Sequence, residues 1–246
     1  MGNQQHLNYQ HINHHMLHVG IMESLELEFS FNGTFLTKID GLRAISVTGI
    51  QTVKLYKDAL NWNGFIVDAL NFIPHDFTQG SFTLHNVTIG KSFHWEQQEN
   101  QTFQGCLRLQ TNDNRILAIN IINVEQYLES VISSEMKSTS SIELLKAHAV
   151  ISRSWVYSQI LRREMMGAGQ HNLTQDNEGL SWQDQSDHTL FDVCADDHCQ
   201  RYQGISKGIT PEVHQAVSDT YRQVLTYQDV LCDTRFSKCC GGISER

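Results

Sequence analysis

The sequence predicts an α+β fold with a β-rich N-terminal half, a central helical hairpin and a mixed α/β C-terminal part. Three observations predict this class. From Leu25 to about Ile122, apolar and polar residues mostly alternate, which is typical of half-buried strands in antiparallel hairpins. From residue 124 to about residue 163, apolar residues instead recur at helical spacing. The remaining part combines one helical segment with short strand-like stretches.

Composition limits the classes of function. The chain has 246 residues, 40% of them hydrophobic, and a formal net charge of −9. This charge argues against nucleic acid as a partner, because phosphate binding depends on clustered Lys and Arg. Since no run of 18 apolar residues occurs, we expect no membrane span in this chain. Its first residues show neither a signal peptide nor an anchor.

We divide the chain into three parts. Residues 1–18 hold five histidines and form a polar N-terminal segment. Residues 19–122 form a β-rich lead-in, and residues 123–246 form the core that carries the candidate site. Because the chain stops at residues 241–246 without a closing element, we expect this core to be truncated at its C-terminus.

The β-rich part contains two predicted hairpins. Asn32-Gly33 favours a tight turn between two alternating segments. A second turn is predicted at residues 111–114, between the strands 107–109 and 115–121. Residues 81–89 alternate regularly and predict a further strand.

Two helices are predicted next, joined by a polar break at residues 137–139. The first covers residues 124–136 and has one apolar stripe, formed by Val124, Tyr127, Leu128, Val131 and Ile132. The second begins with a capping box, in which Ser140 caps the backbone and Glu143 reaches back. It extends to about Arg163.

The C-terminal part contains one more predicted helix and one more hairpin. Thr210-Pro211 opens the helix, which continues through Tyr221, with proline at the favoured first position. Residues 224–236 have the pattern of a short hairpin.

Glu135 is the most informative residue of the first helix. At about 100° per residue, it projects within roughly 20° of Val124 and Leu128, near the middle of the apolar stripe. A carboxylate rarely lies there unless it is paired or functional. It is therefore either a general acid or one half of a structural ion pair with Lys146 or Arg153.

Two histidines and two cysteines lie close together near residue 190. His188, Cys194 and Cys199 have the spacing H-x5-C-x4-C, which lets an imidazole and two thiolates meet around tetrahedral zinc. His198 could replace His188 as a ligand or point toward the substrate. The alternative is a surface loop with unligated thiols. If zinc is bound, we favour a structural role over a catalytic one.

Several segments in order resemble the SpoIID/LytB family. These are Tyr127-Leu128 with Ser134-Glu135-Met136, residues 143–154, residues 199–204, residues 224–227 and residues 237–245. Two departures occur. Residues 137–141 lack the proline and tryptophan that the family commonly has between its two helices, and His148 stands where glutamine is usual.

The resemblance implies a peptidoglycan lytic transglycosylase with Glu135 as its catalytic acid and base. It also implies a preference for denuded glycan strands, 1,6-anhydro-MurNAc products and a location in the cell envelope. Zinc held by one His and two Cys at similar spacing is implied as well. One suitably placed acid can be enough, because the substrate's own C6 hydroxyl is the nucleophile.

Further residues are candidates for contacts with the glycan strand. They are His198, Gln200, Tyr202, Lys146, Arg153 and Ser237. The alternative from another class of function is a non-catalytic glycan-binding module that enhances a cell-wall amidase, since members of the LytB type are linked to such enhancement.

Overall fold

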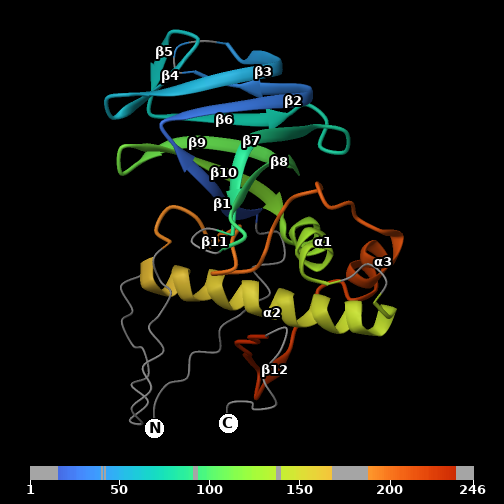
Figure 1. Cartoon of the computed structure of the whole chain (residues 1–246). Coiled ribbons are helices and arrows are strands. Elements are labelled where there is room, and N and C mark those ends of the chain that lie inside the picture. Colours follow the sequence, from blue (N-terminus) through green and yellow to red (C-terminus); the bar gives the residue numbers. More distant parts are fainter. Residues whose placement is uncertain are drawn as a thin grey trace.

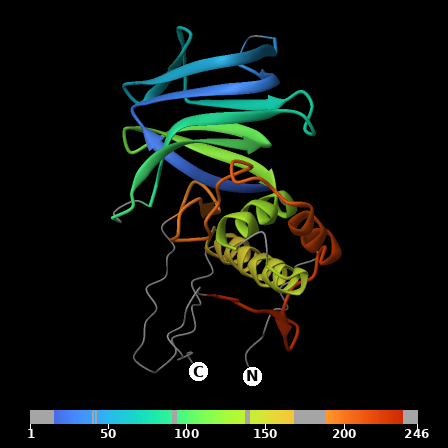
Figure 2. The ribbon, with the colours of Figure 1, turned by 45° about the vertical axis from the view of Figure 1, so that its right-hand side comes forward.

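The computed structural model describes residues 16–39, 41, 43–90, 94–136, 140–167 and 188–236. Eleven strands form one large sheet, and the helices lie together on one side of it, with a separate two-stranded sheet beyond them (Figure 1). The view turned by 45° keeps this separation of strands and helices (Figure 2). The predicted α+β class is therefore confirmed.

The larger sheet follows the order β11-β1-β10-β9-β6-β2-β3-β4-β5, with β7 paired to β2 and β8 paired to β7. Its neighbours are antiparallel except for β1 and β11, which are parallel. The strands are β1 (Met16–Ser24), β2 (Glu26–Thr37), β3 (Ile45–Tyr56), β4 (Ala59–Trp62), β5 (Phe65–Val67), β6 (Ala69–Pro74), β7 (Ser81–Ile89), β8 (Gln97–Gln104), β9 (Cys106–Asn112), β10 (Arg115–Asn123) and β11 (Val193–Cys194).

The hairpin between β9 and β10 confirms one of the two predicted turns. Asn112 and Arg115 face each other, so the loop has two residues. Asp113 and Asn114 both have positive φ, 45° and 59°. Such a turn matches the twist of the flanking strands, and Asn and Asp tolerate this backbone region.

The hairpin predicted at Asn32-Gly33 was wrong, because β2 continues through these residues. Gly33 has φ +99° and belongs to a bulge at which the register with β3 shifts. Before the bulge Phe31 pairs with β7, and after it Phe35 pairs with β6. Glycine with positive φ serves a bulge as well as a turn, and only the non-local pairing decides between them.

The first strand begins inside the segment that the sequence assigned to a polar terminus. β1 starts at Met16 and pairs with β10 along its length. Residues 16–18 therefore belong to the sheet. The rest of the predicted His-rich segment lies outside the described residues.

Two helices follow the large sheet, as predicted. Helix α1 (Val124–Glu135) is capped by Asn123, whose side chain accepts the Glu125 N–H, and its five apolar stripe residues are buried. Helix α2 spans Ile142–Gly167, four residues beyond the predicted end. Its cap is Ser141 rather than Ser140, because the Ser141 hydroxyl accepts the Leu144 N–H at 3.4 Å. The predicted capping box is thus offset by one residue.

The predicted C-terminal helix and hairpin are also present. Helix α3 (Pro211–Asp219) begins with proline, and Thr210 accepts the Val213 N–H as its cap. It ends two residues before the predicted Tyr221. The hairpin consists of β12 (Thr226–Tyr227) and β13 (Val230–Leu231). In the described part of the chain, no helix is long and apolar enough to cross a membrane.

Aromatic rings in contact join the sheet to the helices. The Phe103 ring of β8 lies 5.7 Å from Tyr202, whose ring stacks on Tyr127 of α1 at 5.0 Å. All three side chains are buried. Because the core is continuous through these rings, the sheet fixes the position of α1 and of the segment that contains Tyr202.

Candidate active site

Glu135 is the last residue of α1 and lies at the edge of a cavity. The buried apolar stripe holds the helix against the core, so the orientation of its last turn is fixed. The Glu135 side chain is 18% exposed. The cavity has a volume of about 330 Å³ and is lined, among others, by Glu135, Trp155, Gln159, His198, Arg201 and Phe236.

The two carboxylate oxygens of Glu135 have different surroundings. Oε1 accepts the backbone N–H of Arg201 at 3.0 Å. Oε2 is buried and lies 3.3 Å from Nε2 of His148, without a hydrogen bond among the described residues. A carboxylate held by a backbone donor on one oxygen can keep a defined orientation toward a ligand in the cavity.

The segment that carries Arg201 is attached to both halves of the fold. Strand β11 adds to β1, and the Phe191 ring packs on Gly20, where a Cβ atom would lie 2.6 Å from the ring. The carboxylate of Asp192 accepts the backbone N–H of His18 and forms an ion pair with Arg163 of α2. These contacts place the segment between the sheet and α2.

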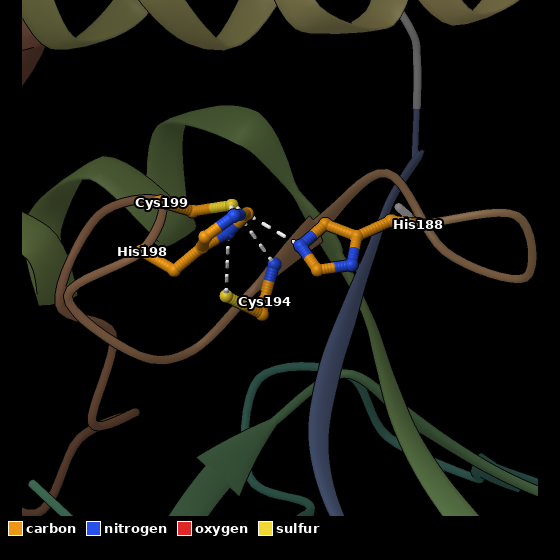
Figure 3. A group of neighbouring side chains, drawn as sticks. All are labelled: His188, Cys194, His198 and Cys199. Atoms are coloured by element: carbon orange, nitrogen blue, oxygen red, sulfur yellow. Dashed lines mark hydrogen bonds between the residues drawn. The ribbon is translucent and has the colours of Figure 1, made fainter. Parts of the chain in front are cut away.

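His188, Cys194, His198 and Cys199 form a group that could hold a metal ion. Their ligand atoms all lie within 4.8 Å of one another. Figure 3 shows the four side chains turned toward one another on this segment. The structure thus brings together the three predicted ligands and also the predicted alternative, His198.

The distances within this group match a tetrahedral site. Sγ of Cys199 lies 3.5 Å from Nε2 of His188 and 3.6 Å from Nδ1 of His198, and Sγ of Cys194 lies 3.8 Å from the same Nδ1. Bonds of about 2.3 Å to sulfur and about 2.0 Å to nitrogen at tetrahedral angles give a sulfur–nitrogen separation of about 3.5 Å. Two thiolates and two imidazoles therefore fit zinc.

The thiols of this group influence each other's protonation. The pKa of Cys194 is lowered, chiefly by the hydrogen bond from Cys199 and further by the contact with His188. The pKa of Cys199 is raised, because it supplies that hydrogen bond and is buried. One thiolate is thus favoured even without a metal, and the thiolate is the form that binds zinc.

Arg201 lies between the Glu135 cavity and a second one. Its guanidinium donates to both carboxylate oxygens of Asp197, each at 2.9 Å, and lies 5.1 Å from the centre of the Trp95 ring. The second cavity has a volume of about 370 Å³, and both cavities are lined by Arg201 and His198. The metal-ligand segment therefore forms the wall between them.

Two of the predicted glycan contacts are buried. Gln200 is 2% exposed and accepts the Tyr127 hydroxyl through Oε1, although it also borders the Glu135 cavity. Tyr202 is 1% exposed, and its hydroxyl donates to Asn120 of β10. These contacts hold the segment on the core, so we assign Tyr202 to packing rather than to substrate.

The two predicted cations do not contact Glu135. Lys146 pairs with Asp219 of α3 at 3.0 Å and with Glu143 at 3.7 Å. Arg153 is completely buried and pairs with Glu125. Because Arg153 is buried, it cannot contact a glycan strand bound in the cavity. Ser237, the last of the predicted contacts, lies outside the described residues.

The sequence did not predict two residues that contact Glu135. His148 fitted the helical register of α2. The only sequence signal for it was that it stands where the family usually has glutamine. Arg201 had no signal, because its contact with Glu135 is made by a backbone N–H from 66 residues away.

Comparison with known proteins covers the same region. A model of the SpoIID family, described as stage II sporulation protein, matches residues 112–227. An uncharacterized protein of Brachyspira hyodysenteriae is 26% identical over 165 residues, which are 67% of this chain and 35% of that protein. The matched part of this chain thus spans about a third of that relative's length. The family match includes α1, Glu135 and the metal-ligand group.

Proposed function

We propose that this chain is a lytic transglycosylase that cleaves the glycan strands of peptidoglycan, since residues 112–227 match the model of the SpoIID family. The family match indicates a function related to the cell wall. The reaction, its substrate and a location in the cell envelope are the further steps that we propose.

In the proposed reaction Glu135 acts first as an acid and then as a base. Its carboxylic acid protonates the oxygen of the MurNAc–GlcNAc bond, and the bond from that oxygen to C1 of MurNAc breaks. The C6 hydroxyl of the same MurNAc attacks C1 and gives its proton to the Glu135 carboxylate. The products are a 1,6-anhydro-MurNAc end and a GlcNAc end with a free hydroxyl, and the acid is restored.

The observation that carries this proposal is that Glu135 is the one carboxylate at the described cavity that is not bonded to an arginine side chain. Glycosidases that use water or a covalent intermediate need two carboxylates. The other carboxylate that lines this cavity, Asp197, has both oxygens bonded to Arg201. Within the described part of the chain, Glu135 accepts a single hydrogen bond, from the Arg201 backbone N–H to Oε1. One acid suits a reaction whose nucleophile belongs to the substrate.

Zinc would be held by Cys194, Cys199, His188 and His198, with four protein ligands. When bound in such a closed site, zinc supplies rigidity rather than Lewis acidity. The ligand Cys199 lies two residues before Arg201, whose N–H binds Glu135. Fixing this segment keeps that donor in place at the catalytic carboxylate.

The test is digestion of glycan strands freed of stem peptides, followed by mass spectrometry of the products. We expect 1,6-anhydro-MurNAc ends from the native protein. Glu135→Gln should lower their rate of formation at least about 100-fold, because the amide cannot supply the proton. Glu129→Gln is the matched control: Glu129 is on the same helix, and its partner is the exposed His214.

Two outcomes contradict the proposal. If the Glu135→Gln variant forms product as fast as the native protein, Glu135 is not the acid. If the native protein forms no product, it is not a lytic transglycosylase. If the native protein binds the strands and stimulates an added cell-wall amidase without forming product, the enhancer alternative replaces the transglycosylase. Strands that still carry stem peptides serve as the comparison substrate and should be cut more slowly.

A further inference from the structure

His148 is a buried histidine whose hydrogen-bonding capacity is unused in the described part of the chain. Its side chain is 1% exposed, and neither Nδ1 nor Nε2 has a hydrogen-bond partner there. Buried polar atoms nearly always have partners, so such an exception needs an explanation. An ordinary core histidine would bond at least one nitrogen to a carbonyl or a hydroxyl.

The nearest polar atom lacks a partner too. Oε2 of Glu135 is buried and lies 3.3 Å from Nε2 of His148. The pair meets at the contact of α1 and α2, where Leu145 and Ala149 on the same side of α2 are buried. The Phe236 ring packs edge-on against the imidazole at 4.8 Å. Catalytic hydrogen bonds are often long without substrate and shorten when it binds.

We propose that His148 is the positioning residue of the catalytic carboxyl group, and that it acts as a neutral imidazole donating Nε2–H to Oε2 of Glu135. This inference rests on the proposed function of Glu135. Neutral histidine has one donor and one acceptor nitrogen. With the donor on Nε2, Nδ1 is the acceptor and faces no described donor.

The direction of this hydrogen bond decides where the acid proton lies. If His148 accepted instead, the proton of Glu135 would be held on Oε2, which is buried away from the cavity. With His148 as donor, the proton lies on Oε1, the oxygen that a glycan strand bound in the cavity can reach. Oε1 can accept the Arg201 N–H and still carry the proton, since it has two lone pairs.

The same donor also serves the second half of the reaction. Once Oε1 has given its proton to the leaving oxygen, the carboxylate has one N–H donor on each oxygen, from Arg201 and from His148. Donors placed in advance stabilise such a developing charge without reorganisation. Oε1 then takes the proton of the C6 hydroxyl. His148 keeps its own proton throughout, so it orients the acid and takes part in no proton transfer.

Kinetics of two variants test the role of the donor. His148→Gln keeps an N–H donor on a side chain of similar reach, whereas His148→Leu has none. Loss of a hydrogen bond to a charged group corresponds to a rate reduced about 10- to 100-fold. We therefore expect His148→Leu to lower kcat by that factor with little change in KM, and His148→Gln to stay within about fivefold of the native kcat.

A spectroscopic test does not depend on activity. The ring nitrogens of 15N-labelled histidine have distinct shifts when protonated or not, and the His148→Gln spectrum identifies the His148 signals. We expect the native protein at neutral pH to show His148 neutral and protonated on Nε2. In the Glu135→Leu variant, which removes the acceptor, the Nε2–H signal should move.

The outcomes separate this inference from the proposed function. An Nδ1–H tautomer, a doubly protonated ring, or a His148→Leu protein with native kcat overturns the positioning role. If the native protein forms no 1,6-anhydro product, the transglycosylase proposal is wrong. The tautomer of His148 then tests only whether Nε2–H donates to Glu135. If His148→Leu does not fold, the spectrum of the native protein still decides.

Discussion

Two glutamates of α1 face α2 with the same exposure and very different partners. The side chains of Glu125 and Glu135 are each 18% exposed. Arg153 binds both oxygens of Glu125, at 3.0 Å and 2.6 Å, and also donates to the carbonyl of Gln223 at 3.1 Å. Glu135 has one backbone donor and one oxygen without a hydrogen bond in the described residues.

The comparison shows that burial alone does not distinguish a structural carboxylate from a catalytic one. A bidentate pair with arginine uses the carboxylate fully and leaves it nothing to offer a substrate. An under-bonded carboxylate at a cavity costs stability and remains available for chemistry. The count of hydrogen bonds, rather than exposure, separates Glu125 from Glu135.

Disrupting the Glu125 pair should lower stability, whereas replacing Glu135 should mainly lower activity. The largest effect on stability is expected at Arg153. Arg153→Leu leaves the Glu125 carboxylate without its cation in a partly buried place and should lower the free energy of unfolding by about 3–5 kcal/mol. Glu135→Gln should change it by less than about 1 kcal/mol, because the amide oxygen still accepts the Arg201 N–H. Urea denaturation measures both values.

The comparison fails if the two changes are equally destabilising. Glu135 would then be structural in the same sense as Glu125. A charge-preserving control is Arg153→Lys, which keeps the cation but loses the bidentate geometry, so it should fall between the native protein and Arg153→Leu.

Local patterns predicted much of the fold. The apolar stripe of α1, a turn within residues 111–114 and proline at the start of α3 are set by neighbouring residues, and each was predicted. The bulge at Gly33 depends on strands paired far along the chain. Strand β1 was not predicted, because its buried residues do not alternate and its first residues adjoin a polar segment.

In the candidate site too, local features were predicted and contacts between distant residues were not. The position of Glu135 on an apolar stripe and the spacing of the cysteines are local signals, and they led to the two groups that the structure places near each other. The partners of the carboxylates are not local. Arg153 was a candidate partner of Glu135 but pairs with Glu125, because the crossing of α1 and α2 decides which residues meet.

Loss of the metal-ligand group should disturb the contacts of Glu135 and leave the pair of Glu125 with Arg153 unchanged. Cys194→Ser removes one of four ligands, so zinc content should fall, and about 2.7 kcal/mol of stability should be lost at a zinc concentration 100 times the Kd. The rate of product formation should also fall, since the segment holds the Arg201 donor. Elemental analysis of untagged protein and urea denaturation check these values.

The matched control for the metal prediction is Cys106→Ser. Cys106 is half-buried in β9 and outside the group of four, so its replacement should leave the zinc content unchanged. A Cys194→Ser protein with native zinc content would exclude Cys194 as a ligand. A His188→Ala protein with native content would leave His198 as the histidine ligand.

The smallest effect should arise at the other end of α1. The Asn123 side chain caps the helix by accepting the Glu125 N–H at 2.8 Å. Asn123→Ala should lower the free energy of unfolding by about 1 kcal/mol, whereas Asn123→Asp keeps the acceptor and should be nearly neutral. Both variants should cleave glycan strands at the native rate, because Glu135 lies roughly 18 Å further along the helix. A clear loss of activity in Asn123→Ala alone would mean that the two ends are coupled, and the contrast between Glu125 and Glu135 would no longer separate stability from catalysis.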